Sequence, residues 1–93
     1  MSEKTQRKRA IASGLVQGVG FRYYVRRVAS RRPVTGFVRN LPDGSVEIEA
    51  QGSPGEVDSF LNEASVGPPG SRVSGFRVEP APELGDEIGF VIR

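Results

Sequence analysis

The sequence predicts an α+β domain in which two helices cover one face of an antiparallel sheet. Two segments have the apolar spacing of amphipathic helices, and each of them lies between segments typical of strands. In addition, two strand-like runs within residues 34–52 flank a turn sequence. With 93 residues, of which 37% are hydrophobic, the chain has the length and composition of one globular domain.

The first half of the chain predicts a strand followed by a helix. Residues 8–16, KRAIASGLV, are compatible with a strand that ends near Gly14. Proline disfavours helical geometry at the residue before it, so Pro33 predicts that the helix ends at about Arg32. The apolar residues that predict this helix and its buried face are Phe21, Tyr24, Val25, Val28 and Ala29.

The second half predicts a hairpin, a helix and two further strands. Residues 34–41 and 45–52 flank the turn sequence PDG. The next helix has Ser53 as its N-cap, Pro54 at its first position and Glu56 three residues after the cap, and it ends near Gly67. Strands over 72–80 and 89–93 complete the chain.

This element order is the ferredoxin-like βαββαβ plan, for which we expect an antiparallel sheet of strand order 4-1-3-2 with both helices on one face and a short extra strand at the C-terminal end. We assign residues 10–93 to a single domain. Residues 1–9 are assigned to a basic arm, and the sequence leaves open whether this arm is ordered.

Composition narrows the chemistry that the chain can perform. It contains no cysteine and no histidine, which excludes disulfides, thiolate nucleophiles and histidine-based catalysis. We therefore expect no metal and no cofactor. No apolar run has the length of a transmembrane helix or of the apolar core of a signal peptide, so the simplest expectation is a cytoplasmic protein without membrane contact. We also expect a monomer.

Positive charge is concentrated in the first half of the chain. Residues 1–40 carry ten Lys or Arg and one acid, whereas residues 41–93 carry three Arg and ten acids.

Within the first half, residues 14–22 read GLVQGVGFR, which places two glycines between a strand and a helix. Gly18 and Gly20 can adopt positive φ, so that backbone N–H groups converge on an anion, and Arg22 in the first helical turn adds two planar donors. These features predict a phosphate-sized anion site, although such glycines are also common as plain turn residues. The two common nucleotide-binding motifs, GxxxxGK[ST] and GxGxxG, are both absent, so the sequence does not support nucleotide binding of either kind.

Two stretches of the chain resemble the signatures of the acylphosphatase family. They are GLVQGVGFR (14–22) and GFVRNLPDGSVEIEAQG (36–52), and the later GPPGSRV and GFVIR are similar as well, so the resemblance runs from about Ala10 to the last residues. The resemblance implies a ferredoxin-like enzyme that hydrolyses the carboxyl-phosphate bond of acyl phosphates to carboxylate and inorganic phosphate.

The resemblance also implies roles for individual residues. The position of Arg22 corresponds to the arginine that binds the phosphate, and that of Asn40 to the asparagine that positions the attacking water. The backbone N–H groups that complete the phosphate site belong to Gln17, Gly18, Val19, Gly20 and Phe21. An amide side chain offers both a donor and an acceptor, so Asn40 suits a water-orienting role, although a strand-end asparagine often only satisfies a neighbouring turn. One role open to the Gln17 side chain is to brace the loop through backbone hydrogen bonds, and we assign it no catalytic role.

The chain departs from the family pattern at Arg32 and Pro33, where a leucine and a glycine usually end the first helix. This puts the end of that helix in doubt but leaves the loop intact. Similar domains occur within larger carbamoyl-transfer maturation proteins that continue into cysteine-rich zinc segments, and the absence of such a segment here favours a free-standing enzyme.

Binding of nucleic acid through the basic surface is the alternative function. The arm contributes Lys4, Arg7, Lys8 and Arg9, and the first helix contributes Arg26, Arg27, Arg31 and Arg32. The aromatic pattern of an RNA-recognition motif is missing from GFVRNLPD, and surface arginines are commonly solvated or paired with acids. We therefore expect no nucleic-acid partner, and acyl phosphate as the substrate.

Overall fold

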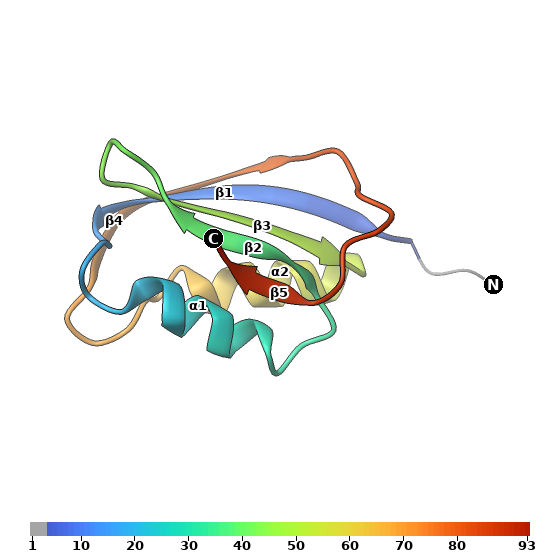
Figure 1. Ribbon diagram of the computed structural model, residues 1–93, viewed down its shortest axis with the longest axis horizontal. Coiled ribbons are helices and arrows are strands. Elements are labelled where there is room, and N and C mark those ends of the chain that lie inside the picture. Colours follow the sequence, from blue (N-terminus) through green and yellow to red (C-terminus); the bar gives the residue numbers. More distant parts are fainter. Residues whose placement is uncertain (1–3) are drawn as a thin grey trace.

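The computed structural model describes residues 4–93, which form one five-stranded sheet with both helices packed on one face (Figure 1). The strand order is β4-β1-β3-β2-β5, so the predicted order 4-1-3-2 is confirmed. β5 pairs with β2 in parallel, and the other neighbouring strands are antiparallel. The elements in chain order are β1 (Gln6–Leu15), α1 (Phe21–Ala29), β2 (Thr35–Asn40), β3 (Val46–Gly52), α2 (Pro54–Ala64), β4 (Arg72–Pro80) and β5 (Phe90–Ile92).

The first strand begins earlier than the charge pattern indicates. The sequence predicts a strand from Lys8, but β1 already begins at Gln6, within the segment assigned to the basic arm, and Gln6 pairs with Gly52 of β3. Residues 1–3 of that arm lie outside the described residues. From the sequence alone, a run of charged residues is expected to be exposed to solvent. Here these residues join the sheet because acidic residues of other segments pair with their charges.

Both helices are shorter than predicted. α1 ends at Ala29 rather than near Arg32, because the amides of Arg31 and Arg32 bond the carbonyls three residues back and so form a tighter final turn. α2 begins as expected, with Ser53 at the N-cap and Pro54 at the first position, but the Ser53 side chain makes no cap hydrogen bond. α2 ends at Ala64, three residues before Gly67.

The core lies between the sheet and the two helices. Alternate residues of β1 and β3 point into it, and the four buried residues of α1 are all members of the apolar stripe that the sequence predicts. The fifth member, Tyr24, is half-buried, and its hydroxyl donates a hydrogen bond to the Glu63 carbonyl of α2 at 2.7 Å. The helix pair is thereby joined by a polar contact at the edge of the core.

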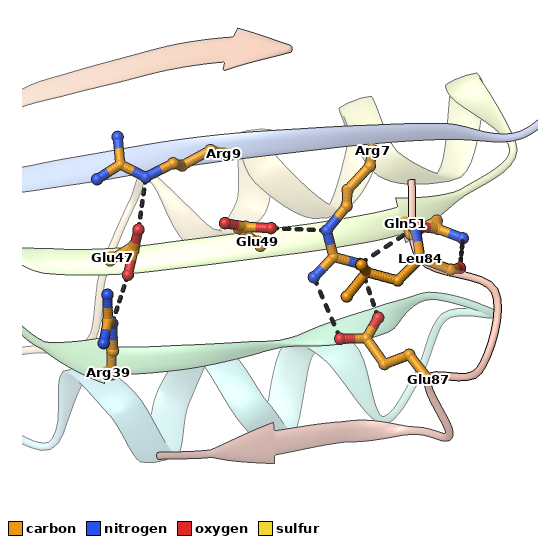
Figure 2. A network of polar contacts seen from close by, with 8 residues as sticks. All are labelled: Arg7, Arg9, Arg39, Glu47, Glu49, Gln51, Leu84 and Glu87. Carbon is orange, nitrogen blue, oxygen red and sulfur yellow. Dashed lines mark hydrogen bonds and ion pairs between the residues drawn. The ribbon is translucent and has the colours of Figure 1, made fainter. Parts of the chain in front are cut away.

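Charged side chains line the opposite face of the sheet, where Figure 2 shows two groups of contacts across β1, β3 and β2. In one group, Glu47 accepts hydrogen bonds from Arg9 and Arg39, although only 3% of Glu47 is exposed. Burial alone would raise the pKa of the Glu47 carboxyl, but the two arginines outweigh it and lower that pKa.

The second group surrounds Arg7, whose side chain is 0% exposed. Its guanidinium donates to Glu49 at 2.6 Å, to Gln51 at 3.2 Å and to both oxygens of Glu87 at 2.8 and 3.1 Å. Glu87 belongs to the segment that leads from β4 across the sheet to β5, so Arg7 ties this segment down (Figure 2). The hydrogen bonds from Arg7 lower the pKa of the Glu87 carboxyl.

Candidate active site

The loop between β1 and α1 has the conformation that its glycines predict. Gly18 has φ of 74° and Gly20 has φ of 79°, which is the left-handed region that favours glycine. A Cβ atom added at either position would meet nothing within 4 Å, so the backbone angle rather than crowding requires glycine. Val16 is buried and Val19 packs against the core, which anchors the loop while both glycines stay exposed.

Helix α1 begins directly after this loop without a negative charge near its start. Gly20 is the N-cap residue, and no acidic residue occurs in the first turn. Phe21 is buried, which fixes the direction of the first turn. The N–H groups of such a turn lack helical acceptors and carry the positive end of the helix dipole. Arg22 lies in this turn, is half-buried, and forms no ion pair with a residue in the described range 4–93.

Asn40 is the last residue of β2, at the same end of the sheet as the loop (Figure 1). Side chains alternate along a strand, so Asn40 lies on the same face as Val38, which is buried under the helices. The Asn40 Oδ1 atom is buried and accepts no hydrogen bond from the described part of the chain. Buried polar atoms are rarely left without a partner, so this unsatisfied acceptor marks Asn40 as a candidate functional residue.

The Gln17 side chain connects the loop to the β2–β3 turn. Its Nε2 donates to the Leu41 carbonyl at 2.8 Å and to the Ser45 carbonyl at 2.9 Å. Asp43 in the same turn accepts hydrogen bonds from the Ser45 hydroxyl and N–H, which lower the pKa of its carboxyl. The structure thus brings the predicted loop and the hairpin that carries Asn40 together.

The bracing role considered for Gln17 is therefore observed, but its two acceptors could not be identified in advance. They lie 24 and 28 residues further along the chain. A local pattern carries no information about such distant partners.

A separate groove of about 620 Å³ runs along α1 and reaches the start of β5. Tyr23 and Phe90 line it, but neither Arg22 nor Asn40 does. A phosphate group needs converging donors more than a deep cavity, so we place the candidate site at the loop. Within residues 4–93, no cluster of His, Cys, Asp or Glu could hold a metal ion.

Several arginines that a nucleic acid would contact are paired within the protein. Arg7 and Arg9 are held by glutamates on the outer face of the sheet, and Lys8 contacts Asp58 at 2.7 Å. Arg31 and Arg32 pair with acids of α2, in line with the expectation that surface arginines are solvated or paired with acids. These pairs lower the positive charge available to a phosphate backbone.

The sequence model of the family described as acylphosphatase matches residues 8–92. The chain belongs to the acylphosphatase family. An acylphosphatase from Chlorobaculum tepidum is 52% identical over 79 residues, which are 85% of this chain and 84% of that relative. An acylphosphatase from Rubrobacter xylanophilus is 46% identical over 92 residues, which are 99% of this chain and 84% of that relative.

The fold of the acylphosphatase family is confirmed by comparison with solved structures. The crystal structure of acylphosphatase from Bacillus subtilis superposes with a TM-score of 0.89 at 38% identity, and the match covers 97% of this chain and 99% of that one. As a member of the acylphosphatase family, the chain is a hydrolase that acts on acid anhydrides. Membership implies an acyl phosphate as substrate and inorganic phosphate as product. None of the described helices is long and apolar enough to cross a membrane.

Proposed function

We propose that this chain hydrolyses acyl phosphates at the loop between β1 and α1. In this mechanism the backbone N–H groups of residues 17–21 and the Arg22 guanidinium hold the phosphate, and Asn40 orients the attacking water. The observation that carries the proposal is the contact between the loop and the β2–β3 hairpin: the Gln17 side chain hydrogen-bonds the hairpin next to Asn40.

The phosphate site is supported by backbone geometry and charge. Positive φ at Gly18 and Gly20 lets successive N–H groups turn toward one side, as in other anion-binding nests. The start of α1 adds N–H groups without acceptors, and Arg22 adds a planar pair of donors that matches two phosphate oxygens. Without an acid in the first turn, no internal carboxylate competes with the substrate there.

The water site is supported by the unpartnered oxygen of Asn40. Oδ1 is an acceptor only, so it can take a hydrogen bond from a water and hold the water oxygen in one orientation. An amide is not a base near neutral pH, so the contribution of Asn40 is positioning rather than proton removal.

The bond changes require no further catalytic base. The water oxygen forms a bond to phosphorus, the bond between phosphorus and the carboxyl oxygen breaks, and the electron pair leaves with the carboxylate. The water proton passes to a phosphate oxygen, which yields dihydrogen phosphate and the carboxylate. Because the leaving group is a weak base, the reaction depends mainly on positioning and on stabilising charge around the phosphoryl group.

Phosphate release from benzoyl phosphate, measured without added metal, tests the mechanism. We expect Arg22→Gln and Asn40→Ala each to lower kcat at least about 100-fold, the scale for removing one transition-state donor or positioning group. Circular dichroism and thermal unfolding check that each variant is folded.

Two variants serve as matched controls. Arg26→Gln makes the same change one helical turn further along α1, and Asn62→Ala removes an exposed amide from α2, and both should keep wild-type kcat. Full activity in a folded Arg22→Gln variant would contradict the phosphate role. Tight, salt-sensitive binding of oligonucleotides without hydrolysis would favour the nucleic-acid alternative.

A further inference from the structure

We propose that Gln17 is a positioning residue: its side-chain amide sets the distance between the phosphate-holding loop and Asn40. The proposal rests on the function proposed above. It assigns to the Gln17 side chain a role in turnover that is separate from the N–H group that Gln17 offers to the phosphate.

The orientation of the amide is decided by its partners. Both atoms that it contacts are backbone carbonyl oxygens, of Leu41 and Ser45, which accept and cannot donate hydrogen bonds. Only the NH₂ group of Gln17 can satisfy both of them, so its two hydrogens are used and the group is held at two points. A side chain held in this way keeps the loop in a defined position.

The two acceptors flank the position of Asn40. Leu41 follows Asn40 directly, and Ser45 precedes Val46, the residue paired with Asn40 across the hairpin. The same two residues close the turn, since the Leu41 N–H donates to the Ser45 carbonyl at 2.8 Å. Gln17 therefore contacts both ends of the β2–β3 turn, directly beside Asn40 and its pairing partner Val46.

The backbone ladder does not replace this contact. The pairing of β1 with β3 ends at Ala12 and Val46, and the last residues of β1 pair only with β4. Within residues 4–93, the two hydrogen bonds of Gln17 are the only ones that join residues 16–20 to residues 40–46. Without the amide, no hydrogen bond would join the loop itself to the hairpin, and only packing and the sheet pairing that ends at Ala12 would hold the phosphate site relative to the water site.

Loss of the amide should affect turnover rather than phosphate binding. The N–H groups and Arg22 that hold phosphate remain in place, whereas the water held by Asn40 is no longer fixed relative to phosphorus. A displacement of about 1 Å in such a geometry costs on the order of 100-fold in rate. For Gln17→Met, which keeps the length of the side chain but removes both donors, we expect kcat to fall about 10- to 100-fold. The inhibition constant for inorganic phosphate should change less than about 3-fold.

A double-mutant cycle with Asn40→Ala separates positioning from general stability. If Gln17 acts through Asn40, then Gln17→Met should lower kcat much less in the Asn40→Ala background than in the wild type. Gln51→Met is the matched control: Gln51 also donates to a backbone carbonyl, that of Leu84 at 2.8 Å, but at the other end of β3. It should lower thermal stability without changing kcat.

Three results would overturn the proposal: wild-type kcat in Gln17→Met, losses that multiply fully with those of Asn40→Ala, or a phosphate inhibition constant that rises as much as kcat falls. If Gln17→Met does not fold, Gln17→Asn gives the same test, because its amide is one methylene too short to reach both carbonyls. Wild-type kcat in that variant would count equally against the proposal. The proposed function fails separately, by full activity in Arg22→Gln or Asn40→Ala.

Discussion

Replacing Arg7 with methionine should destabilise the fold strongly without touching the candidate active site. The Arg7 side chain is 0% exposed and donates four hydrogen bonds to three residues. Methionine fills much of the same space but leaves Glu49 and Glu87 without their cation. Removing one partner of a buried ion pair costs about 3–5 kcal/mol of unfolding free energy, because the charge left behind is poorly solvated.

The exposure of the two glutamates decides where in that range the loss should lie. Their side chains are 20% exposed at Glu49 and 11% at Glu87, so water can partly solvate both. We therefore expect the lower end, about 3 kcal/mol. For a domain of this size each kcal/mol shifts Tm by about 4–8 °C, so Tm should fall by about 12–24 °C.

Thermal and urea unfolding followed by circular dichroism measure this loss, with Lys8→Met as the control. Lys8 is the next residue of β1, but its ion pair with Asp58 is open to water, with side chains 25% and 55% exposed, and is worth less than about 1 kcal/mol. An equal loss in Arg7→Met and Lys8→Met would refute the reasoning. Because Arg7 lies near the start of β1, far along the strand from the loop, kcat of folded Arg7→Met should match the wild type.

Other predictions concern pH, backbone space and metal. The pKa of Glu87 is lowered in the folded state, so the unfolded state binds more protons below about pH 5. The unfolding free energy, measured in urea, should therefore fall as pH drops through that lowered pKa. It should fall less steeply in Glu87→Gln. Gly36→Ala should lower the unfolding free energy, measured in urea, by about 1–3 kcal/mol, since a Cβ there would lie 1.9 Å from the Glu49 carbonyl oxygen. Gly55→Ala, at an exposed position of α2 where an added Cβ meets nothing within 4 Å, should be neutral or stabilising. Gly18→Ala, which strains a φ of 74°, should raise the inhibition constant for phosphate. Turnover of benzoyl phosphate should persist in EDTA, and its loss there would contradict the charge roles given to Arg22 and the loop.

Much of the fold could be predicted because it depends on local periodicity. A helix buries every third or fourth residue and a strand every second, so the stripe from Phe21 to Ala29 and the alternation from Val46 to Ala50 identify their elements from neighbours alone. The positive φ of Gly18 and Gly20 was also predictable from neighbouring residues, since a strand must turn sharply into a helix there and glycine allows this conformation.

The strand and helix ends were less predictable because they depend on contacts outside the element. α1 ends before Arg32, whose amide belongs to the tighter final turn and whose guanidinium is held by Glu56 and Glu63 of α2. β1 extends back to Gln6 because the charge of Arg7 is neutralised by distant glutamates. Neither effect can be recognised in the segment concerned.

The sequence alone was enough to predict the order of elements, the glycine loop and its arginine, since each depends on residues close together in the chain. The tertiary structure decided which polar groups are buried and which contact one another. Arg7 is enclosed by residues up to 80 positions away, and Gln17 contacts two carbonyls that lie 24 and 28 residues later. A buried polar group is stable only with a partner, and which partner folding brings to it depends on the path of the whole chain.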